Sequence, residues 1–228
     1  WRSAGAHAFM TPTTRALVFD FDGTIIDSET PVYESWAETF RFAGAEPIPL
    51  GRWLQDIGKA DGHGIDVRSE LCNQIGVDAI SAQVETFRKD LCDEMLHSLP
   101  LRDGVEHWIL AASAAGIPMG VASSSPTSWV SGHIERLGLA DRFTTLSCAD
   151  PGIPGKPDPT VYLTACESLG VAPNEALAIE DSTHGVAAAI AAGMRCIAAP
   201  GPITKTMEFG HASVCVDSLS ELNPADWL

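Results

Sequence analysis

The sequence has few basic residues and no long apolar run. Its 228 residues include 14 Lys and Arg against 30 Asp and Glu, a formal net charge of −16. This charge repels nucleic acids and anionic lipids, and no run of Lys or Arg provides a local exception. No segment approaches the roughly 20 consecutive apolar residues that cross a bilayer. We therefore expect neither nucleic acid nor a membrane as a partner.

Cysteine pairs with metal-binding or redox spacing are also missing. The six cysteines are scattered, include no CxxC pair and lie mostly within apolar segments. This pattern is typical of buried free thiols in a reducing compartment, so we expect a cytoplasmic protein. Residues 1–14 lack the charged segment and apolar run of a secretory signal, and we interpret them as a flexible leader.

Apolar segments with strand character alternate with helical patterns over most of the chain. The strand-like segments are residues 16–21, 117–122, 143–146, 176–179, 196–199 and 214–216. Because helical patterns separate most of them, the natural architecture is an α/β fold with a mostly parallel sheet covered by helices on both faces.

One segment interrupts this alternation. Between residues 28 and 100 every periodic pattern is helical, and the expected helices cover residues 31–43, 50–57, 66–75 and 81–99. These four are sufficient for a small bundle. We therefore predict a catalytic core made of residues 15–27 and 101–228, interrupted by a helical insert at residues 28–100.

Polar residues follow the predicted strands at their carboxyl ends, where ligands gather in parallel sheets. They are Asp20, Asp22, Gly23 and Thr24 after the first strand, Ser123, Ser124 and Ser125 after the second, Lys156 after the third and a short loop, and Glu180, Asp181 and Ser182 after the fourth. A single Asp at a strand end is more often a helix cap or a surface charge. Groups at several strand ends together favour one site.

The four carboxylates in this set point to a metal ion. Asp20, Asp22, Glu180 and Asp181 would repel one another unless they were protonated or neutralised by a cation. Hard oxygen ligands beside an anionic substrate are typical of Mg²⁺, so we predict Mg²⁺ as the cofactor with these residues around it.

The same residues fit covalent phosphoryl transfer. Asp20 can attack phosphorus as a nucleophile, while Asp22 protonates the leaving alkoxide and later activates water. Gly23 lets the chain turn directly after them. Lys156 would hold the transferring phosphoryl group with its positive charge, and Ser123 would donate a hydrogen bond to it. A lysine alone at this place would more often be a solvated loop residue.

Four segments resemble the motifs of the haloacid dehalogenase superfamily. They are FDFDGTIID at 19–27, Ser123 after Val121 and Ala122, GKPDP at 155–159 and IEDSTHGVAAAIAAGM at 179–194. The resemblance extends over about residues 17–222. Within the superfamily, the chain is similar to the beta-phosphoglucomutase and phosphoglycolate phosphatase branch. It implies a Rossmann-like core with a central first strand and a mobile helical cap.

The resemblance also implies roles for individual residues. Asp20 would be the nucleophile and Asp22 the acid/base, with Ser123 and Lys156 as phosphoryl ligands. Glu180 and Asp181 would lie near Mg²⁺, which would also bind the backbone carbonyl of Asp22. We accordingly predict a phosphatase of a small phosphate ester, a sugar phosphate being the favoured class, that acts as a monomer or weak dimer.

Alternatives within and beyond the family remain at this point. Dehalogenases lack the second aspartate of the first motif, so Asp22 argues against them. Beta-phosphoglucomutases have a His where this chain has Val32, so hydrolysis is preferred to mutase activity. A non-catalytic phospho-acceptor module would have no use for Asp22.

A glycine-rich loop in the insert, residues 57–64, is the candidate for reading the substrate. Its glycines would allow close approach, and Lys59 and His63 would meet an anionic or hydroxylated group, although a plain interhelical turn is equally compatible with the pattern. We group Lys59 and His63 with Gly23, Thr24 and Ser124 as predicted substrate contacts. His184 is expected to cap the helix that follows the fourth strand.

Overall fold

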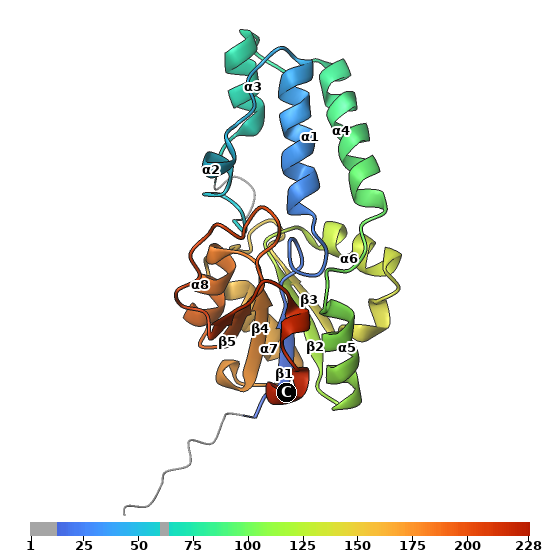
Figure 1. Cartoon of the computed structure of the whole chain (residues 1–228), viewed down its shortest axis with the longest axis vertical. Coiled ribbons are helices and arrows are strands. Elements are labelled where there is room, and N and C mark those ends of the chain that lie inside the picture. The colour runs from blue at the N-terminus through green and yellow to red at the C-terminus, as the bar shows by residue number, and fades with distance from the viewer. Residues whose placement is uncertain (1–12, 60–63) are drawn as a thin grey trace, which may run out of the picture.

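The computed structural model describes residues 13–59 and 64–228. Its strands are β1 (Ala16–Phe19), β2 (Met119–Ser123), β3 (Thr145–Cys148), β4 (Ala176–Glu180), β5 (Arg195–Ala198) and β6 (Val214–Cys215). They form one sheet in the order β3-β2-β1-β4-β5-β6, and every pairing is parallel. The first strand is central, and the predicted α/β, Rossmann-like fold is confirmed (Figure 1).

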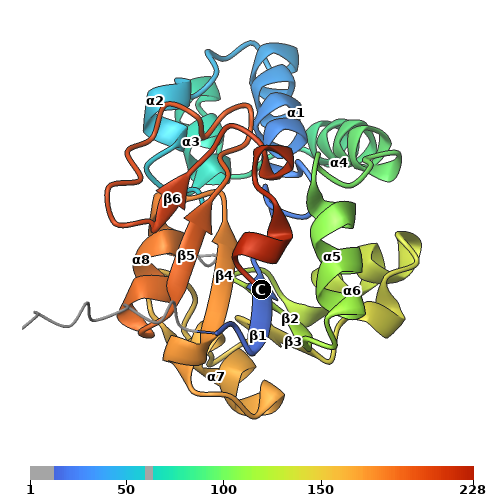
Figure 2. The same cartoon turned by 60° about the horizontal axis from the view of Figure 1, so that its bottom comes forward.

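Helices cover both faces of the sheet. They are α5 (Val105–Ala114), α6 (Thr127–Arg136), α7 (Thr160–Leu169) and α8 (Thr183–Ala191). Alternate residues of a strand face opposite sides. Leu17 and Phe19 thus belong to the core cluster that includes α5 and α6, and Ala16 and Val18 to the one that includes α7 and α8. All four are fully buried, as the middle strand of a covered sheet requires. Figure 2 shows the sheet between these two pairs of helices.

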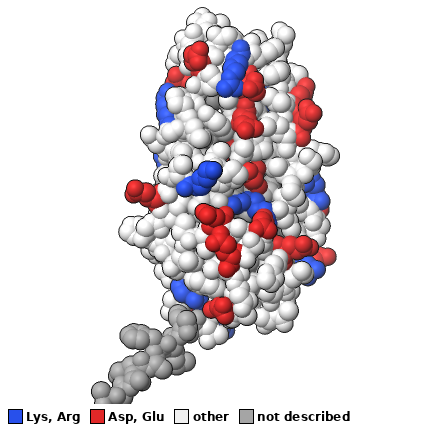
Figure 3. Space-filling view, in the orientation of Figure 1, with Lys and Arg blue, Asp and Glu red and all other residues white. Residues whose placement is uncertain are grey.

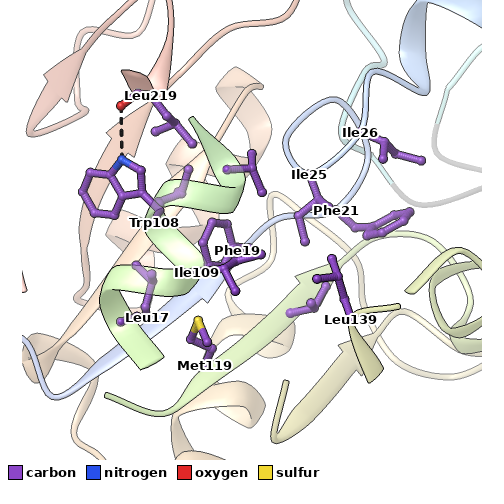
Figure 4. Close-up of a cluster of buried hydrophobic side chains, with 14 of the residues drawn as sticks. Leu17, Phe19, Phe21, Ile25, Ile26, Trp108, Ile109, Met119, Leu139 and Leu219 are labelled. Carbon is purple, nitrogen blue, oxygen red and sulfur yellow. Dashed lines mark hydrogen bonds between the residues drawn. The ribbon is translucent and has the colours of Figure 1, made fainter. Parts of the chain in front are cut away.

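The C-terminal segment closes the core beside α5. Trp108 is fully buried, and its indole donates a hydrogen bond of 3.2 Å to the carbonyl oxygen of Leu219 (Figure 4). Replacing such a tryptophan by alanine typically costs about 3–5 kcal/mol, so its packing and this hydrogen bond hold the C-terminal segment against α5. Five of the cysteines are buried and Cys215 is exposed, and all six are free thiols. Within the described residues, no helix has the length and hydrophobicity to cross a membrane.

Four helices stand beyond the carboxyl ends of the strands (Figure 1). They are α1 (Glu29–Phe42), α2 (Leu50–Trp53), α3 (Val67–Ile75) and α4 (Ala82–His97). They share a small core around Phe40, Ile48 and Leu71. We call residues 28–100 the cap and the remainder of the described chain the core.

The second cap helix is shorter than predicted. It ends at Trp53 and does not extend to Ile57. Asp56 accepts hydrogen bonds from the Lys59 ammonium group and the Ile65 amide, each at 2.7 Å. Beyond Trp53 the backbone continues in turns, in which the amides of Gln55 and Asp56 donate to the carbonyl oxygens of Arg52 and Trp53.

Candidate active site

A lysine and two carboxylates are buried together at the ends of β1 and β4. Lys156 Nζ donates to Asp20 Oδ1 and, at 2.7 Å, to Glu180 Oε1. Glu180 also accepts from the Tyr162 hydroxyl at 2.7 Å, and Lys156 Nζ lies 5.1 Å from the centroid of the Tyr162 ring. Burial alone would lower the pKa of Lys156, but the charges of Asp20 and Glu180 outweigh it and raise that pKa. Lys156 therefore remains a cation.

A third carboxylate, Asp181, joins this group. Asp20, Glu180 and Asp181 each offer an oxygen atom, and these atoms lie within 4.8 Å of one another. Burial, with a contribution from Glu180, raises the pKa of Asp20 to about 7, and burial together with Asp20 and Glu180 raises that of Asp181 well above its ordinary value. One ammonium group does not balance three carboxylates. The cluster is therefore suited to a divalent cation with oxygen ligands.

The space beside Asp181 depends on a glycine. Gly23 has a φ of +80°, and a Cβ atom at this position would lie 2.1 Å from Asp181 Oδ2. Arg102 fixes the same loop, because its guanidinium donates to the carbonyl oxygens of Gly23, Ala199 and Pro200. The next residue, Thr24, is buried, and its hydroxyl has no hydrogen-bond partner among the described residues.

The side chain of Asp22 is not part of the acidic cluster. Its Oδ1 accepts from Ser28 Oγ at 2.7 Å and from Trp129 Nε1 at 2.9 Å. Its Oδ2 accepts from Ser125 Oγ at 2.5 Å and, more weakly, from Ser123 Oγ at 3.5 Å. Asp22 is half-buried, whereas Asp20 is buried. The two aspartates of one motif thus have different surroundings.

A cavity of about 440 Å³ lies between the cap and the core, and Asp22 forms part of its wall. The rest of the lining comes from both parts of the chain. The core contributes Ser125, Pro126 and Trp129, and the cap contributes Ser28, Glu29, Val32, Trp53, Asp56, Ile57, Gly58, Lys59, Gly64, Ile65 and Val67. Burial, together with the charges of Asp22 and Asp20, raises the pKa of Glu29 to about 8. On the face drawn in Figure 3, acidic side chains are spread over the upper and lower parts of the molecule, with basic ones among them.

The cap loop contacts the core directly at the edge of this cavity. Ser124 Oγ donates to the carbonyl oxygen of Gly58 at 2.7 Å, and His184 Nδ1 lies 2.9 Å from the carbonyl oxygen of Ile57. A Cβ atom on Gly58 would lie 2.4 Å from Ser182 Oγ, so only glycine permits this approach. Because Ser182 Oγ accepts from the Gly185 amide, Ser182 caps α8, and the expectation that His184 does so was wrong.

The residues predicted from the sequence fall into three groups. Asp20, Lys156, Glu180 and Asp181 lie together. Asp22 lines the cavity, and Ser123 is buried beside it. Ser124 contacts the cap backbone, and Lys59 lines the cavity while paired with Asp56. His63 lies outside the described residues.

The sequence placed Ser123 and Ser125 near Asp22 but gave no indication of Ser28 or Trp129. Trp129 has the apolar character of a core residue and is the third residue of α6. Helical side chains lean toward the helix N-terminus, which here follows a strand end. A tryptophan in this first turn, with an N–H that can reach the strand ends, could therefore have been predicted as a site residue.

Comparison with known proteins identifies the class of this protein. The model of the haloacid dehalogenase-like hydrolases matches residues 14–193. The chain therefore belongs to this family, which confirms both the predicted resemblance and the predicted class of enzyme.

Individual relatives are similar over most of their length. The Bacillus subtilis (strain 168) protein named "Putative phosphatase YhcW" is 39% identical over 92% of this chain and 94% of its own. Validoxylamine A 7'-phosphate phosphatase of Streptomyces hygroscopicus subsp. limoneus is 30% identical over 80% of this chain and 84% of its own. Phosphatases are therefore among its relatives.

The fold matches a solved relative. CbbY of Rhodobacter sphaeroides, in complex with phosphate, superposes with a TM-score of 0.75 and 27% identity, covering 92% of this chain and 97% of that chain. A variant of CbbY was solved in complex with xylulose-(1,5)bisphosphate and has the same TM-score of 0.75.

Proposed function

We propose that this hydrolase is a Mg²⁺-dependent phosphatase of small phosphate esters, with sugar phosphates as the favoured substrates. The observation that carries this proposal is the pair of aspartates with different surroundings. Asp20 contacts a buried ammonium group beside an acidic cluster, while Asp22 faces a cavity. One is placed as a nucleophile and the other as a proton donor and acceptor.

The reaction proceeds in two displacements. The Asp20 carboxylate attacks phosphorus, and the bond to the ester oxygen breaks as Asp22 gives that oxygen a proton. Asp22 then takes a proton from water, the water oxygen attacks phosphorus, and the bond to Asp20 breaks to release phosphate. Lys156 and the Ser123 hydroxyl stabilise charge on the phosphoryl oxygens.

Asp20 and Asp181 are the best placed to hold the metal, together with the backbone carbonyl of Asp22. Glu180 already accepts from Lys156, Tyr162 and Ser182, whereas the only side-chain donor to Asp181 among the described residues is Thr204, at 3.2 Å. When bound there, Mg²⁺ would offset the repulsion between the phosphate dianion and these carboxylates.

The cavity supports a substrate of metabolite size. Its volume of about 440 Å³ lies within the range of small-molecule sites, and its wall combines apolar side chains with the polar groups of Glu29, Asp56 and Lys59. A sugar phosphate suits this wall, because its hydroxyl groups can bind the polar side chains and its carbon atoms can pack against the apolar ones. Lys59, His63, Gly23, Thr24 and Ser124 remain our proposed substrate contacts, and the cap is proposed to close over the strand ends.

A phosphate-release assay over a panel of phosphorylated metabolites tests the proposal. We expect turnover of sugar phosphates with Mg²⁺, none in excess chelator, and no need for a bisphosphate activator. Turnover that persists in chelator would exclude the metal. A product that is an isomerised sugar phosphate would instead indicate a mutase.

A further inference from the structure

We propose that Trp129 is a positioning residue for Asp22, and that its indole N–H determines how well the enzyme cleaves esters with poor leaving groups. The inference rests on the proposed function, because it gives Asp22 the role of proton donor to the leaving oxygen. Trp129 takes no part in bond making or breaking and acts through the carboxylate that it contacts.

One oxygen of Asp22 accepts a hydrogen bond from a donor whose direction is fixed, the indole N–H of Trp129. Trp129 Nε1 is 2.9 Å from Asp22 Oδ1, and both side chains line the cavity. An indole N–H points along the ring plane, so its direction is set by the ring, whereas the hydroxyl hydrogens of Ser28 and Ser125 rotate freely. Trp129 is therefore the partner that can fix the orientation of the carboxylate.

The ring of Trp129 is itself held in place. It packs edge-on against His133, with centroids 4.5 Å apart and an interplanar angle of 68°. The ring of His133 in turn packs against that of Phe21, with centroids 5.9 Å apart. Phe21 is fully buried, and it is the residue between Asp20 and Asp22 in the sequence. Residues of the core thus support the indole donor.

The donor set also distinguishes the two oxygens of Asp22. An indole can only donate, so it keeps Oδ1 as an acceptor. The Ser125 hydroxyl at Oδ2 can donate or accept, and it tolerates a proton on that oxygen. The arrangement assigns Oδ2 as the atom that carries the proton to the leaving group.

The test is Trp129→Phe, measured with esters of different leaving groups. The leaving group of para-nitrophenyl phosphate needs little protonation. The leaving group of sorbitol 6-phosphate is an alkoxide, which must be protonated as it leaves. Because Trp129→Phe removes a hydrogen bond to a charged group, we expect kcat for sorbitol 6-phosphate to fall roughly 10- to 100-fold. We expect little change with para-nitrophenyl phosphate, and little change in KM for either.

A matched control comes from the core. Trp108 also donates an indole hydrogen bond, to the carbonyl oxygen of Leu219 at 3.2 Å, and is not among the residues that line the cavity. Trp108→Phe should leave the ratio of the two rates unchanged. An equal loss of both rates in Trp129→Phe, a change in KM alone, or no loss would overturn the proposal.

A double-mutant cycle separates this inference from the proposed function. If Trp129 acts through Asp22, then Trp129→Phe has no further effect in an Asp22→Asn background. If the wild type cleaves no ester of the phosphate-release panel, the proposed function itself fails. If Trp129→Phe does not fold, benzothienylalanine at this position keeps the ring shape without the N–H, and the same loss is expected.

Discussion

The two lysines near the site lie in different environments. The Lys156 side chain is 1% exposed and contacts two carboxylates, whereas the Lys59 side chain is 24% exposed and contacts one. A buried charge depends on its partners, because water cannot replace them. A partly exposed ion pair contributes little by itself. The core end of the site is therefore fixed by electrostatics, while the cap wall can change without disturbing it.

The two regions also differ in how they are built. The carboxylates of the core end, Asp20 and Glu180, come from the ends of β1 and β4, which pair over four residues, and Lys156 comes from the loop after β3. The cap wall comes largely from the loop between α2 and α3, and hydrogen bonds from Ser124 and His184 reach its backbone. We infer that the core end governs the chemistry and the cap wall governs the choice of substrate.

The largest effect is expected at the core end. Asp20→Asn keeps the shape of the side chain but removes the attacking charge, so turnover should fall roughly 10⁴-fold or more. Steady-state rates and circular dichroism would show a lost activity with an intact fold. Lys59→Met is the control and should retain most turnover. A substantially active Asp20→Asn variant would disprove the role of nucleophile.

Stability should separate the two lysines. Lys156→Met leaves two buried carboxylates without their cation and should lower the free energy of unfolding by about 3–5 kcal/mol. For Lys59→Met the loss should be about 0–1 kcal/mol. Urea unfolding in excess chelator measures both, because no metal can then replace the lost ammonium group. Similar losses for the two variants would contradict the comparison.

The pH dependence of the metal-free protein follows from Asp20. Its pKa, about 7 in the folded chain against an ordinary 3.8, is raised mainly by burial. The folded state therefore holds this proton more tightly than the unfolded state, and its contribution is lost as the pH rises through about 7. With chelator, Asp20→Asn should gain stability relative to the wild type between pH 5 and pH 8. Parallel melting-temperature curves for the two proteins would contradict this.

The smallest effect is expected at the cap wall. Lys59→Ala should alter kcat/KM by roughly two- to fivefold, and by different factors for different phosphate esters, since an exposed charge contributes about 0.5–1 kcal/mol. The affinity for Mg²⁺ should stay the same. A panel of sugar phosphates measures this. If every ester lost the same factor, the loop would be a connector and substrate choice would lie elsewhere in the cap.

The sequence by itself determined the parallel fold and the grouping of Asp20, Lys156, Glu180 and Asp181. Alternating strands and helices place successive strand ends at one edge of a sheet, so residues after those strands meet whatever the details of packing.

Only the tertiary structure decided the partners of Asp22, the contact of Ser124 with the cap and the early end of α2. Trp129 lies 107 positions from Asp22 and has the apolar character of a core residue in a helix. Whether its N–H meets a carboxylate depends on how α6 packs against the loop after β1. Periodicity records which face of a helix is buried, but side-chain direction is set by neighbours that are distant in the sequence.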